Sequence, residues 1–128
     1  YIVGVSSLSG YRGLPRAAAY GASKSALIHF LESIRFHLSE FNIFVSIVCP
    51  GFVKTPLTDK NDFPMPFLID SSKAAEIICN GIQRHKKEIS FPIPFNWFLK
   101  LTRILPYFIY EKIVFYLWRL QMKQAKSQ

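Results

Sequence analysis

The pattern of apolar and polar positions predicts alternating strands and helices along most of the chain. The opening run YIVGVSSLSG is rich in β-branched residues and stops in Ser and Gly, which is typical of a buried strand that ends in a loop. The apolar run NIFVSIVCPG predicts a second buried strand, which Pro50 and Gly51 end. Between the two runs, apolar residues recur at helical spacing and predict an amphipathic helix from about residue 18 to about residue 39: Leu27, Phe30, Leu31, Ile34 and Leu38.

This order of elements predicts a parallel sheet with a right-handed crossover, and therefore an α/β fold. Ser7 lies at the carboxyl end of the first strand, and Pro50 and Gly51 lie at the carboxyl end of the second. The carboxyl ends of parallel strands meet at one rim of the sheet, where the ligands of such folds bind. We therefore expect a functional site at this rim.

The run YGASK at the start of the predicted helix places a tyrosine and a lysine four positions apart. Residues i and i+4 of a helix share one face, so the Lys24 ammonium can lie near the Tyr20 phenol. A nearby cation favours the phenolate and lowers the pKa of a tyrosine, which makes proton transfer at neutral pH feasible. The alternative is an ordinary surface tyrosine beside a solvated lysine.

The stretch from VSSLSGYRGLPRAAAYGASKSAL through VSIVCPGFVKTPLT resembles the C-terminal half of the classical short-chain dehydrogenases/reductases (SDRs), which are NAD(P)-dependent oxidoreductases with a Rossmann-type fold. Three features occur in the order and spacing of that family: a serine thirteen positions before the tyrosine, the Tyr-x-x-x-Lys pair, and a Pro-Gly-x-x-x-Thr turn after the next strand. The resemblance is close over the first 60 residues and looser over the next 30. It implies that residues 1–94 form the C-terminal half of a Rossmann-type SDR domain, a parallel sheet with flanking helices.

The resemblance implies catalytic roles for three residues. Tyr20 corresponds to the general acid/base, and Ser7 corresponds to the serine that hydrogen-bonds the substrate oxygen. Lys24 corresponds to the residue that lowers the pKa of the tyrosine and hydrogen-bonds the nicotinamide ribose. The alternative for Ser7 is a strand-end or turn serine, and Ser6 and Ser9 are rival candidates that only the family spacing separates from it.

The resemblance also implies contacts with NAD or NADP. The residues implied are Tyr20, Lys24, Pro50, Gly51, Val53 and Thr55. The Val53 backbone and the Thr55 hydroxyl would lie near the nicotinamide carboxamide. The alternatives are a Pro-Gly pair that only ends a strand and a loop threonine whose hydroxyl is satisfied within the protein.

The glycine-rich turn with which the family binds the pyrophosphate is missing from these residues. The six glycines include no Gly-x-Gly pair at a strand-to-helix turn, and the Asn-Ala-Gly segment and catalytic asparagine of the family are absent as well. We therefore expect a C-terminal fragment of a parent about twice as long, or a truncated product, that does not bind the dinucleotide normally. Such a fragment should leave an apolar sheet edge, which favours aggregation or pairing with another chain.

Composition and charge exclude several other classes. Half of the 128 residues are hydrophobic, which suits one domain or part of one. Cys49 and Cys79 have no metal-ligand or redox spacing, so we expect reduced, buried cysteines and a cytoplasmic location. The three histidines are scattered, and no metal site is expected. The net charge of +8 comes from basic residues dispersed over several elements, so nucleic-acid binding is not expected either.

The segment TPLTDKNDFPMPFLID has the composition of a loop with apolar contacts. In the family this segment covers the substrate, so the resemblance implies an apolar pocket lined by Phe63, Met65, Phe67 and Leu68. Anchoring of the loop to the body of the domain is an equal alternative. A helix should follow with Asp70 or Ser71 as its N-cap, and ISFPIP predicts the last short strand.

Residues 95–128 form a hydrophobic and basic tail whose pattern predicts helices. Its charged residues and Pro106 keep every apolar run shorter than a membrane-spanning helix requires. A peripheral contact with a membrane surface suits the mixture of aromatic and basic residues. The alternatives are helices that close the substrate pocket or that form an oligomer interface.

Together these features predict an NAD(P)-dependent oxidoreductase that interconverts an alcohol and a carbonyl, on an apolar or lipid-like substrate. The resemblance implies a homodimer or homotetramer in the parent, formed through the outer face of the helix that carries Tyr20 and Lys24. The competing interpretation is a truncated, non-catalytic SDR remnant that acts as an interaction module.

Overall fold

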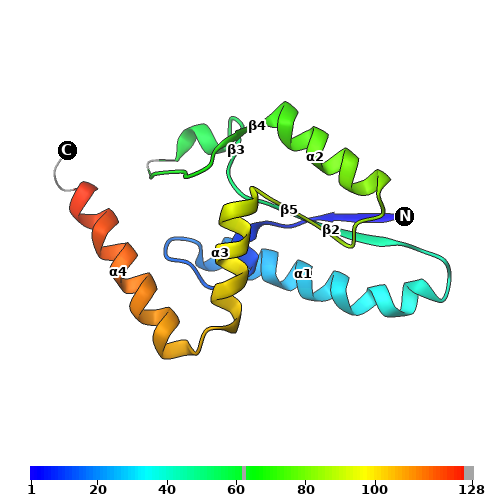
Figure 1. Ribbon diagram of the computed structural model, residues 1–128, viewed down its shortest axis with the longest axis horizontal. Helices are drawn as coiled ribbons and strands as arrows, with labels where there is room; N and C mark the ends of the chain where they lie inside the picture. Colours follow the sequence, from blue (N-terminus) through cyan, green and yellow to red (C-terminus); the bar gives the residue numbers. More distant parts are fainter. Residues whose placement is uncertain (62, 126–128) are drawn as a thin grey trace.

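The computed structural model describes residues 1–61 and 63–125 and has an α/β architecture (Figure 1). Its central sheet is parallel, with the strand order β1-β2-β5. The strands are β1 (Ile2–Val5), β2 (Val45–Pro50) and β5 (Glu88–Phe91). β2 pairs along both of its edges, with Val45 opposite Ile2 and Ile47 opposite Glu88. The parallel sheet predicted from the sequence is confirmed.

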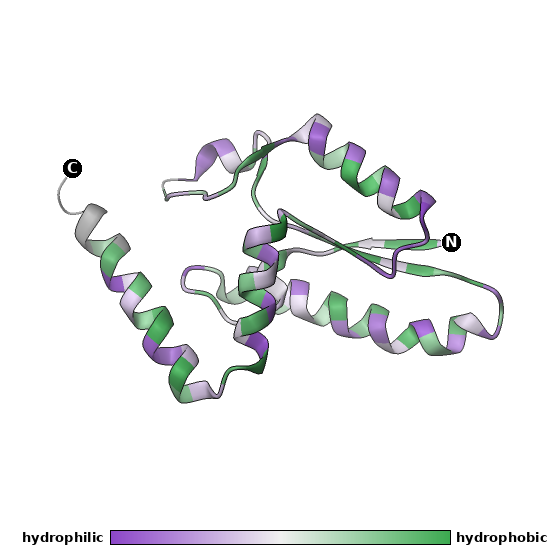
Figure 2. Ribbon diagram, in the orientation of Figure 1, coloured by the Kyte–Doolittle hydropathy of each residue, from purple (hydrophilic) through white to green (hydrophobic). Residues whose placement is uncertain are grey.

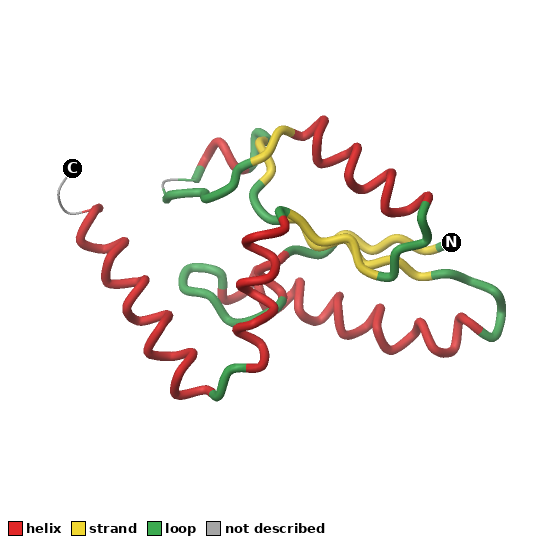
Figure 3. Tube along the Cα trace, in the orientation of Figure 1, coloured by secondary structure: helices red, strands yellow, loops and turns green. Residues whose placement is uncertain are grey.

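Helices cover both faces of the sheet, which gives three layers (Figures 1 and 3). Side chains of β2 alternate between two apolar clusters, because successive residues of a strand point to opposite faces. One cluster joins the sheet to α1 (Ala18–Ser39) and α3 (Ile93–Ile104), and its members include Ile28, Leu31, Val45, Ile47, Cys49 and Leu99. The other joins the sheet to α2 (Ser71–Gln83) through Val48, Ala74, Ile89 and Phe91.

Short elements connect these layers. The 3-10 turn η1 (Leu8–Gly10) lies between β1 and α1. The predicted loop after β2 contains the short strand β3 (Val53–Lys54), the 3-10 turn η2 (Thr58–Lys60) and the short strand β4 (Ile69–Asp70), and β3 pairs with β4 in a small parallel sheet. Asp70 is the N-cap residue of α2, although its side chain makes no capping hydrogen bond.

The tail is helical, as its pattern predicts. α3 is followed at Pro106 by a second helix, α4 (Tyr107–Ala125). Within residues 1–61 and 63–125, no helix has both the length and the apolar character needed to cross a bilayer.

The predicted boundaries of α1 are confirmed, but one member of its predicted apolar face is misplaced. Ile28 and Leu31 are buried, and Leu27, Ile34 and Leu38 pack partly against the same cluster. Phe30 is 57% exposed because it lies one residue, or about 100°, away from the buried stripe that passes through Leu31. The prediction that Phe30 faces the core is therefore wrong.

β1 was predicted to be a buried strand, and its burial is not found. Ile2, Val3 and Val5 are 38%, 37% and 53% exposed, whereas all but the last residue of β2 are buried. Among the described residues β1 pairs only with β2, so its other edge has no neighbour. The apolar open edge expected from the sequence is thus present.

Two further expectations are corrected by the structure. The last strand ends at Phe91, and Ile93 and Pro94 begin α3 rather than extend the strand, because a proline without an N–H is tolerated in the first helical turn. Cys79 is exposed on α2 and not buried. Cys49 is buried as expected, and its burial raises the pKa of the thiol to about 11, so this residue stays protonated at neutral pH.

We expect Leu31→Ala to lower the free energy of unfolding by about 2–5 kcal/mol, since it leaves a cavity in the core. The Leu31 side chain fills the space that a Cβ at Gly4 of β1 would take, so the truncation also loosens β1. Urea denaturation followed by circular dichroism measures this loss. Phe30→Ala, at the exposed neighbouring position, is the control and should cost less than about 1 kcal/mol. Equal losses in both variants would contradict the packing of α1 described above.

Candidate active site

The carboxyl end of β1 is attached to α1 through a buried serine. Ser6 is 3% exposed, and its Oγ donates a hydrogen bond to the carbonyl oxygen of Lys24 at 2.8 Å. This bond holds the strand against the second turn of the helix. The hydroxyl of Ser6 is thereby committed to the backbone, which argues against Ser6 as the residue that binds a substrate oxygen.

Ser7 lies at the rim of the sheet, where it is half-buried. Its Oγ accepts hydrogen bonds from the backbone N–H of Ser9 at 3.2 Å and from the Ser9 hydroxyl at 2.8 Å. Ser7 is also the N-cap residue of η1, and the long 3.5 Å contact from its Oγ to the carbonyl oxygen of Pro50 reaches the end of β2. The Ser6 hydroxyl donates to Lys24 and the Ser9 hydroxyl donates to Ser7. Of the three serines, Ser7 therefore donates the longest, and so the weakest, hydrogen bond with its own hydroxyl proton.

Tyr20 and Lys24 lie in the first two turns of α1. The Lys24 Nζ lies 5.6 Å from the centroid of the Tyr20 ring and donates a hydrogen bond to the carbonyl oxygen of Val5 at 3.2 Å. The ammonium is therefore held at the carboxyl end of β1. The Tyr20 ring is 51% exposed, which leaves its phenol accessible from solvent.

Two glycines permit the close approach of η1 to α1. A Cβ at Gly10 would lie 2.9 Å from the backbone carbon of Lys24 and 3.0 Å from the nitrogen of Ser25. A Cβ at Gly21, next to Tyr20, would lie 3.1 Å from the carbonyl oxygen of Ser9. The turn η1 after Ser7 and the first turns of α1 thus pack backbone to backbone. As a result, one rim of the sheet carries Ser7, Tyr20, Lys24 and Pro50.

The remaining predicted cofactor contacts lie in the turn after β2. Gly51 donates its N–H to the carbonyl oxygen of Phe91 at 2.7 Å, which fixes the turn to β5. The carbonyl oxygen of Val53 accepts a hydrogen bond from the Thr58 hydroxyl at 2.8 Å, and the Thr55 hydroxyl lies 3.3 Å from that same hydroxyl. The described hydrogen bonds of Val53 and Thr55 stay within this turn and do not reach Ser7, Tyr20 or Lys24.

The segment after this turn is attached to the body by aromatic contacts. The ring of Phe63 lies 6.0 Å from that of Phe52, and the ring of Phe67 lies 6.2 Å from that of Phe95 in α3. Phe67 and Leu68 are nevertheless 55% and 41% exposed. The segment is therefore anchored and also presents apolar surface, which is compatible with both predicted roles.

The sequence of this chain is similar to those of known proteins. Residues 1–64 match the family profile described as short chain dehydrogenase. The chain belongs to the short-chain dehydrogenase family. An uncharacterized oxidoreductase of Myxococcus xanthus is 45% identical over 106 residues, which are 83% of this chain and 42% of the relative. Human 17-beta-hydroxysteroid dehydrogenase 13 is 32% identical over 109 residues, covering 83% of this chain and 36% of that protein.

Solved structures agree with the fold. A 4-hydroxyisoleucine dehydrogenase complexed with NADH is 28% identical, with a TM-score of 0.53 over 69% of this chain and 41% of the other. A short-chain dehydrogenase of Sphingobium yanoikuyae in complex with NADPH shares the fold at 19% identity and a TM-score of 0.62, over 69% of this chain and 35% of the other. The SDR chain described here spans less than half the length of the relatives it matches.

A polar network built on the buried Tyr11 and the partly exposed Glu88 and Lys100 braces the Ser7 loop of this SDR, and it was not found from the sequence. The Tyr11 hydroxyl donates a hydrogen bond to the carboxylate of Glu88 on β5, and the Lys100 Nζ on α3 lies 2.9 Å from the same carboxylate oxygen. Burial is the main cause that raises the pKa of the Tyr11 hydroxyl, and its hydrogen bond to Glu88 raises this pKa further. Burial alone would raise the pKa of Glu88, but the hydrogen bonds from Tyr11 and Lys100 outweigh it and hold this pKa below its usual value.

No metal site accompanies the network. In the part of the SDR chain that the structure describes, no three His, Cys, Asp or Glu side chains come close enough together to hold a metal ion.

We expect Gly10→Ala to lower the free energy of unfolding by about 1–3 kcal/mol, because its methyl group collides with the backbone of α1 and must push η1 away. Gly13→Ala is the matched control: it lies in the same loop, and a Cβ there meets nothing within 4 Å. Urea denaturation compares the two variants. A stable Gly10→Ala variant would contradict the close packing between the Ser7 turn and α1.

The network also predicts how stability depends on pH. The pKa of Glu88 is lower in the folded chain than the 4.5 of an unperturbed Glu. The ionised carboxylate therefore stabilises the folded chain fully above pH 4.5, and this stabilisation is lost as the pH falls through the pKa that Glu88 has in the folded chain. We expect the free energy of unfolding to fall on acidification, and Glu88→Gln to reduce this fall. Glu76→Gln, which removes only the exposed pair with Lys73, should keep it. Parallel pH profiles for wild type and Glu88→Gln would contradict the prediction.

Proposed function

We propose that this chain supplies the proton-transfer half of an NAD(P)-dependent oxidoreductase site that interconverts an alcohol and a carbonyl. The observation that carries the proposal is the position of the Lys24 ammonium, which is held at the carboxyl end of β1 beside the Tyr20 ring. Ser7 lies on the same rim, with its Oγ between the ends of β1 and β2. Proton donor, cation and hydroxyl therefore face the edge at which ligands of parallel sheets bind.

The nicotinamide cofactor would supply or accept the hydride, and the chain would manage the proton. Tyr20 gives its phenolic proton to the carbonyl oxygen in reduction and takes the alcohol proton in oxidation. The Ser7 hydroxyl makes only a long contact with Pro50, so its proton can turn toward the substrate oxygen. The two hydrogen bonds that Ser7 accepts from Ser9 polarise this hydroxyl and fix its direction.

The donor set at the rim suits the nicotinamide end of NAD or NADP. An ammonium has three N–H donors, and Lys24 directs one of them to Val5, so the others can hydrogen-bond a ribose hydroxyl. Pro50, Gly51, Val53 and Thr55 would pack against the nicotinamide from the turn after β2. The glycine-rich turn that receives a pyrophosphate does not occur in these 128 residues, so cofactor binding would require residues outside them.

The exposed apolar side chains near the rim support an apolar or lipid-like substrate. Phe67 and Leu68 present apolar surface beside the stacked rings of Phe52 and Phe95, whose centroids are 6.3 Å apart. On the outer face of α1, Phe30 and Phe36 are 57% and 75% exposed, which supports a homodimer or homotetramer through this helix. A cytoplasmic location stays a prediction.

A chimera of these residues with the upstream segment of the Myxococcus xanthus relative tests the catalytic roles. We expect it to bind NADH or NADPH, as measured by fluorescence titration, and to turn over apolar alcohols or ketones. Tyr20→Phe removes only the transferable proton, so kcat should fall about 10²–10⁴-fold while the Kd for the cofactor stays within about twofold. Tyr116→Phe, which changes a similarly exposed tyrosine far along the tail, is the control and should keep full activity.

The same titrations separate the enzyme from the competing interpretation. Lys24→Ala should weaken cofactor binding as well as turnover, because it removes the proposed ribose donor. Full activity of Tyr20→Phe would refute the catalytic role of Tyr20. Failure of the intact chimera to bind either cofactor would favour the non-catalytic interaction module, for which the open edge of β1 provides the surface.

A further inference from the structure

α3 has an apolar outward side and a mixed inward side, where the apolar Leu99 is buried beside polar residues. Asn96 and Thr102 are 6% and 4% exposed, and Asn96 donates a hydrogen bond to the Ser90 hydroxyl at 2.7 Å. The outward stripe consists of Ile93, Trp97, Phe98, Leu101 and Ile104, which are 67%, 68%, 44%, 54% and 79% exposed. A helix that borders water usually turns polar and charged residues outward. The outward stripe is therefore a surface that suits an apolar contact.

Exposed apolar residues also follow Pro106 in α4. Figure 2 shows hydrophobic positions distributed along both helices. We call the exposed apolar side chains of the two helices the tail face, which comprises the α3 stripe together with Tyr107, Phe108, Ile109, Phe115, Tyr116, Leu117, Leu120 and Met122 of α4. Scattered single apolar residues need no explanation, but a dense set of exposed aromatic and aliphatic side chains on two successive helices indicates an interaction site.

The elbow between the two helices is fixed to the body by Arg12. Its Nη1 donates hydrogen bonds to the carbonyl oxygens of Thr102 at 2.7 Å and Arg103 at 3.0 Å. Its guanidinium also lies 4.2 Å from the centroid of the Tyr110 ring in α4. Arg12 belongs to the loop between Ser7 and Tyr20, so the tail face keeps a defined orientation relative to the candidate active site.

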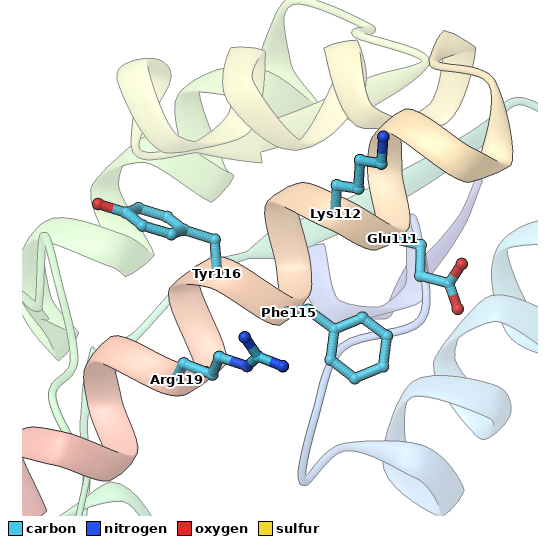
Figure 4. Close-up of a pocket in the computed structure, with 5 residues that line it drawn as sticks. All are labelled: Glu111, Lys112, Phe115, Tyr116 and Arg119. Atoms are coloured by element: carbon cyan, nitrogen blue, oxygen red, sulfur yellow. The ribbon is translucent and has the colours of Figure 1, made fainter.

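Basic side chains accompany the aromatic residues on α4. Lys112 and Arg119 are two turns apart, and Phe115 and Tyr116 lie between them in the sequence. These four residues and Glu111 line an open hollow of about 440 Å³ (Figure 4). The hollow thus combines two cations and one carboxylate with two aromatic rings. On α3 the two basic residues are engaged with the body: Lys100 pairs with Glu88, and the Arg103 guanidinium lies 5.5 Å from the centroid of the Tyr11 ring.

We propose that the tail face binds the surface of an anionic lipid membrane, in the plane of the interface. Trp, Tyr and Phe side chains favour the boundary between headgroups and acyl chains, while Lys and Arg interact with anionic headgroups. A second copy of the chain is a poorer occupant, because a symmetric contact would bring the same basic residues toward one another. This binding does not depend on the oxidoreductase activity proposed above.

Co-sedimentation of the 128-residue chain with vesicles tests the proposal. We expect binding to vesicles of phosphatidylcholine with about one third phosphatidylserine, and several-fold weaker binding to phosphatidylcholine alone. Trp97→Ser combined with Leu101→Ser should lower the partition coefficient at least about tenfold, since it removes two apolar anchors. Phe41→Ser, at a position 72% exposed in the turn after α1, is the matched control and should bind like wild type.

The charges are tested in the same assay. Lys112→Gln combined with Arg119→Gln should weaken binding to the anionic vesicles about tenfold or more and leave binding to phosphatidylcholine unchanged. Arg84→Gln combined with Lys86→Gln removes two exposed cations at the end of α2 and should have little effect. Equal losses in the two double variants would show attraction by net charge alone and would overturn the tail face as the binding site.

A second measurement keeps the proposal testable if the open edge of β1 causes self-association. In a Trp118→Phe variant Trp97 is the one remaining tryptophan, and brominated lipids should quench its fluorescence. Absence of quenching in anionic vesicles would overturn the proposal. Sedimentation velocity gives the other decisive outcome: a dimer of the wild-type chain that Trp97→Ser with Leu101→Ser abolishes, without vesicle binding, would assign the tail face to a second copy.

Discussion

The attachment of the β1 carboxyl end to the first two turns of α1 determines the geometry of the candidate site. Lys24 makes both bonds of this attachment: its carbonyl oxygen accepts from Ser6, and its Nζ donates to the carbonyl oxygen of Val5. The contact requires Gly10, because any larger residue would touch the helix backbone. Since Tyr20 precedes Lys24 by one helical turn and Ser7 follows Ser6, the same attachment sets the relative positions of both proposed catalytic side chains.

The loop between Ser7 and Tyr20 is held from a second direction by α3. Tyr11 reaches Glu88, which Lys100 also contacts, and Arg12 reaches the carbonyl oxygens at the end of α3. Two consecutive loop residues thus connect the rim of the sheet to the tail. A polar network of this kind is specific only when its members are satisfied together. Burial, followed by the shared hydrogen bond, raises the pKa of Tyr11, and the same bond helps to lower the pKa of Glu88.

Much of this architecture follows from local signals in the sequence. The spacing of Leu27, Leu31, Ile34 and Leu38 defines α1, and the uninterrupted apolar run defines β2. Features that depend on contacts between distant parts of the chain could not be predicted from these local patterns. The exposure of β1 depends on which strands lie beside it, and the Tyr11–Glu88 contact joins residues with no common periodicity. Periodicity also could not show that α3 carries apolar residues on both sides, since Leu99 meets the core while Trp97 and Leu101 are exposed.

The parallel order of the sheet has a consequence for the way in which the chain acquires its structure. Each strand pair of the central sheet joins segments separated by a whole helix, such as Ile2 with Val45 and Ile47 with Glu88. Pairs of this type require closure of a long loop before any bond forms, so they make folding slow, whereas a helix forms from neighbours in the chain. We therefore expect α1, with Tyr20 and Lys24 in place, to arise early. The contact between Ser7 and Pro50 would form late, when β1 and β2 finally meet.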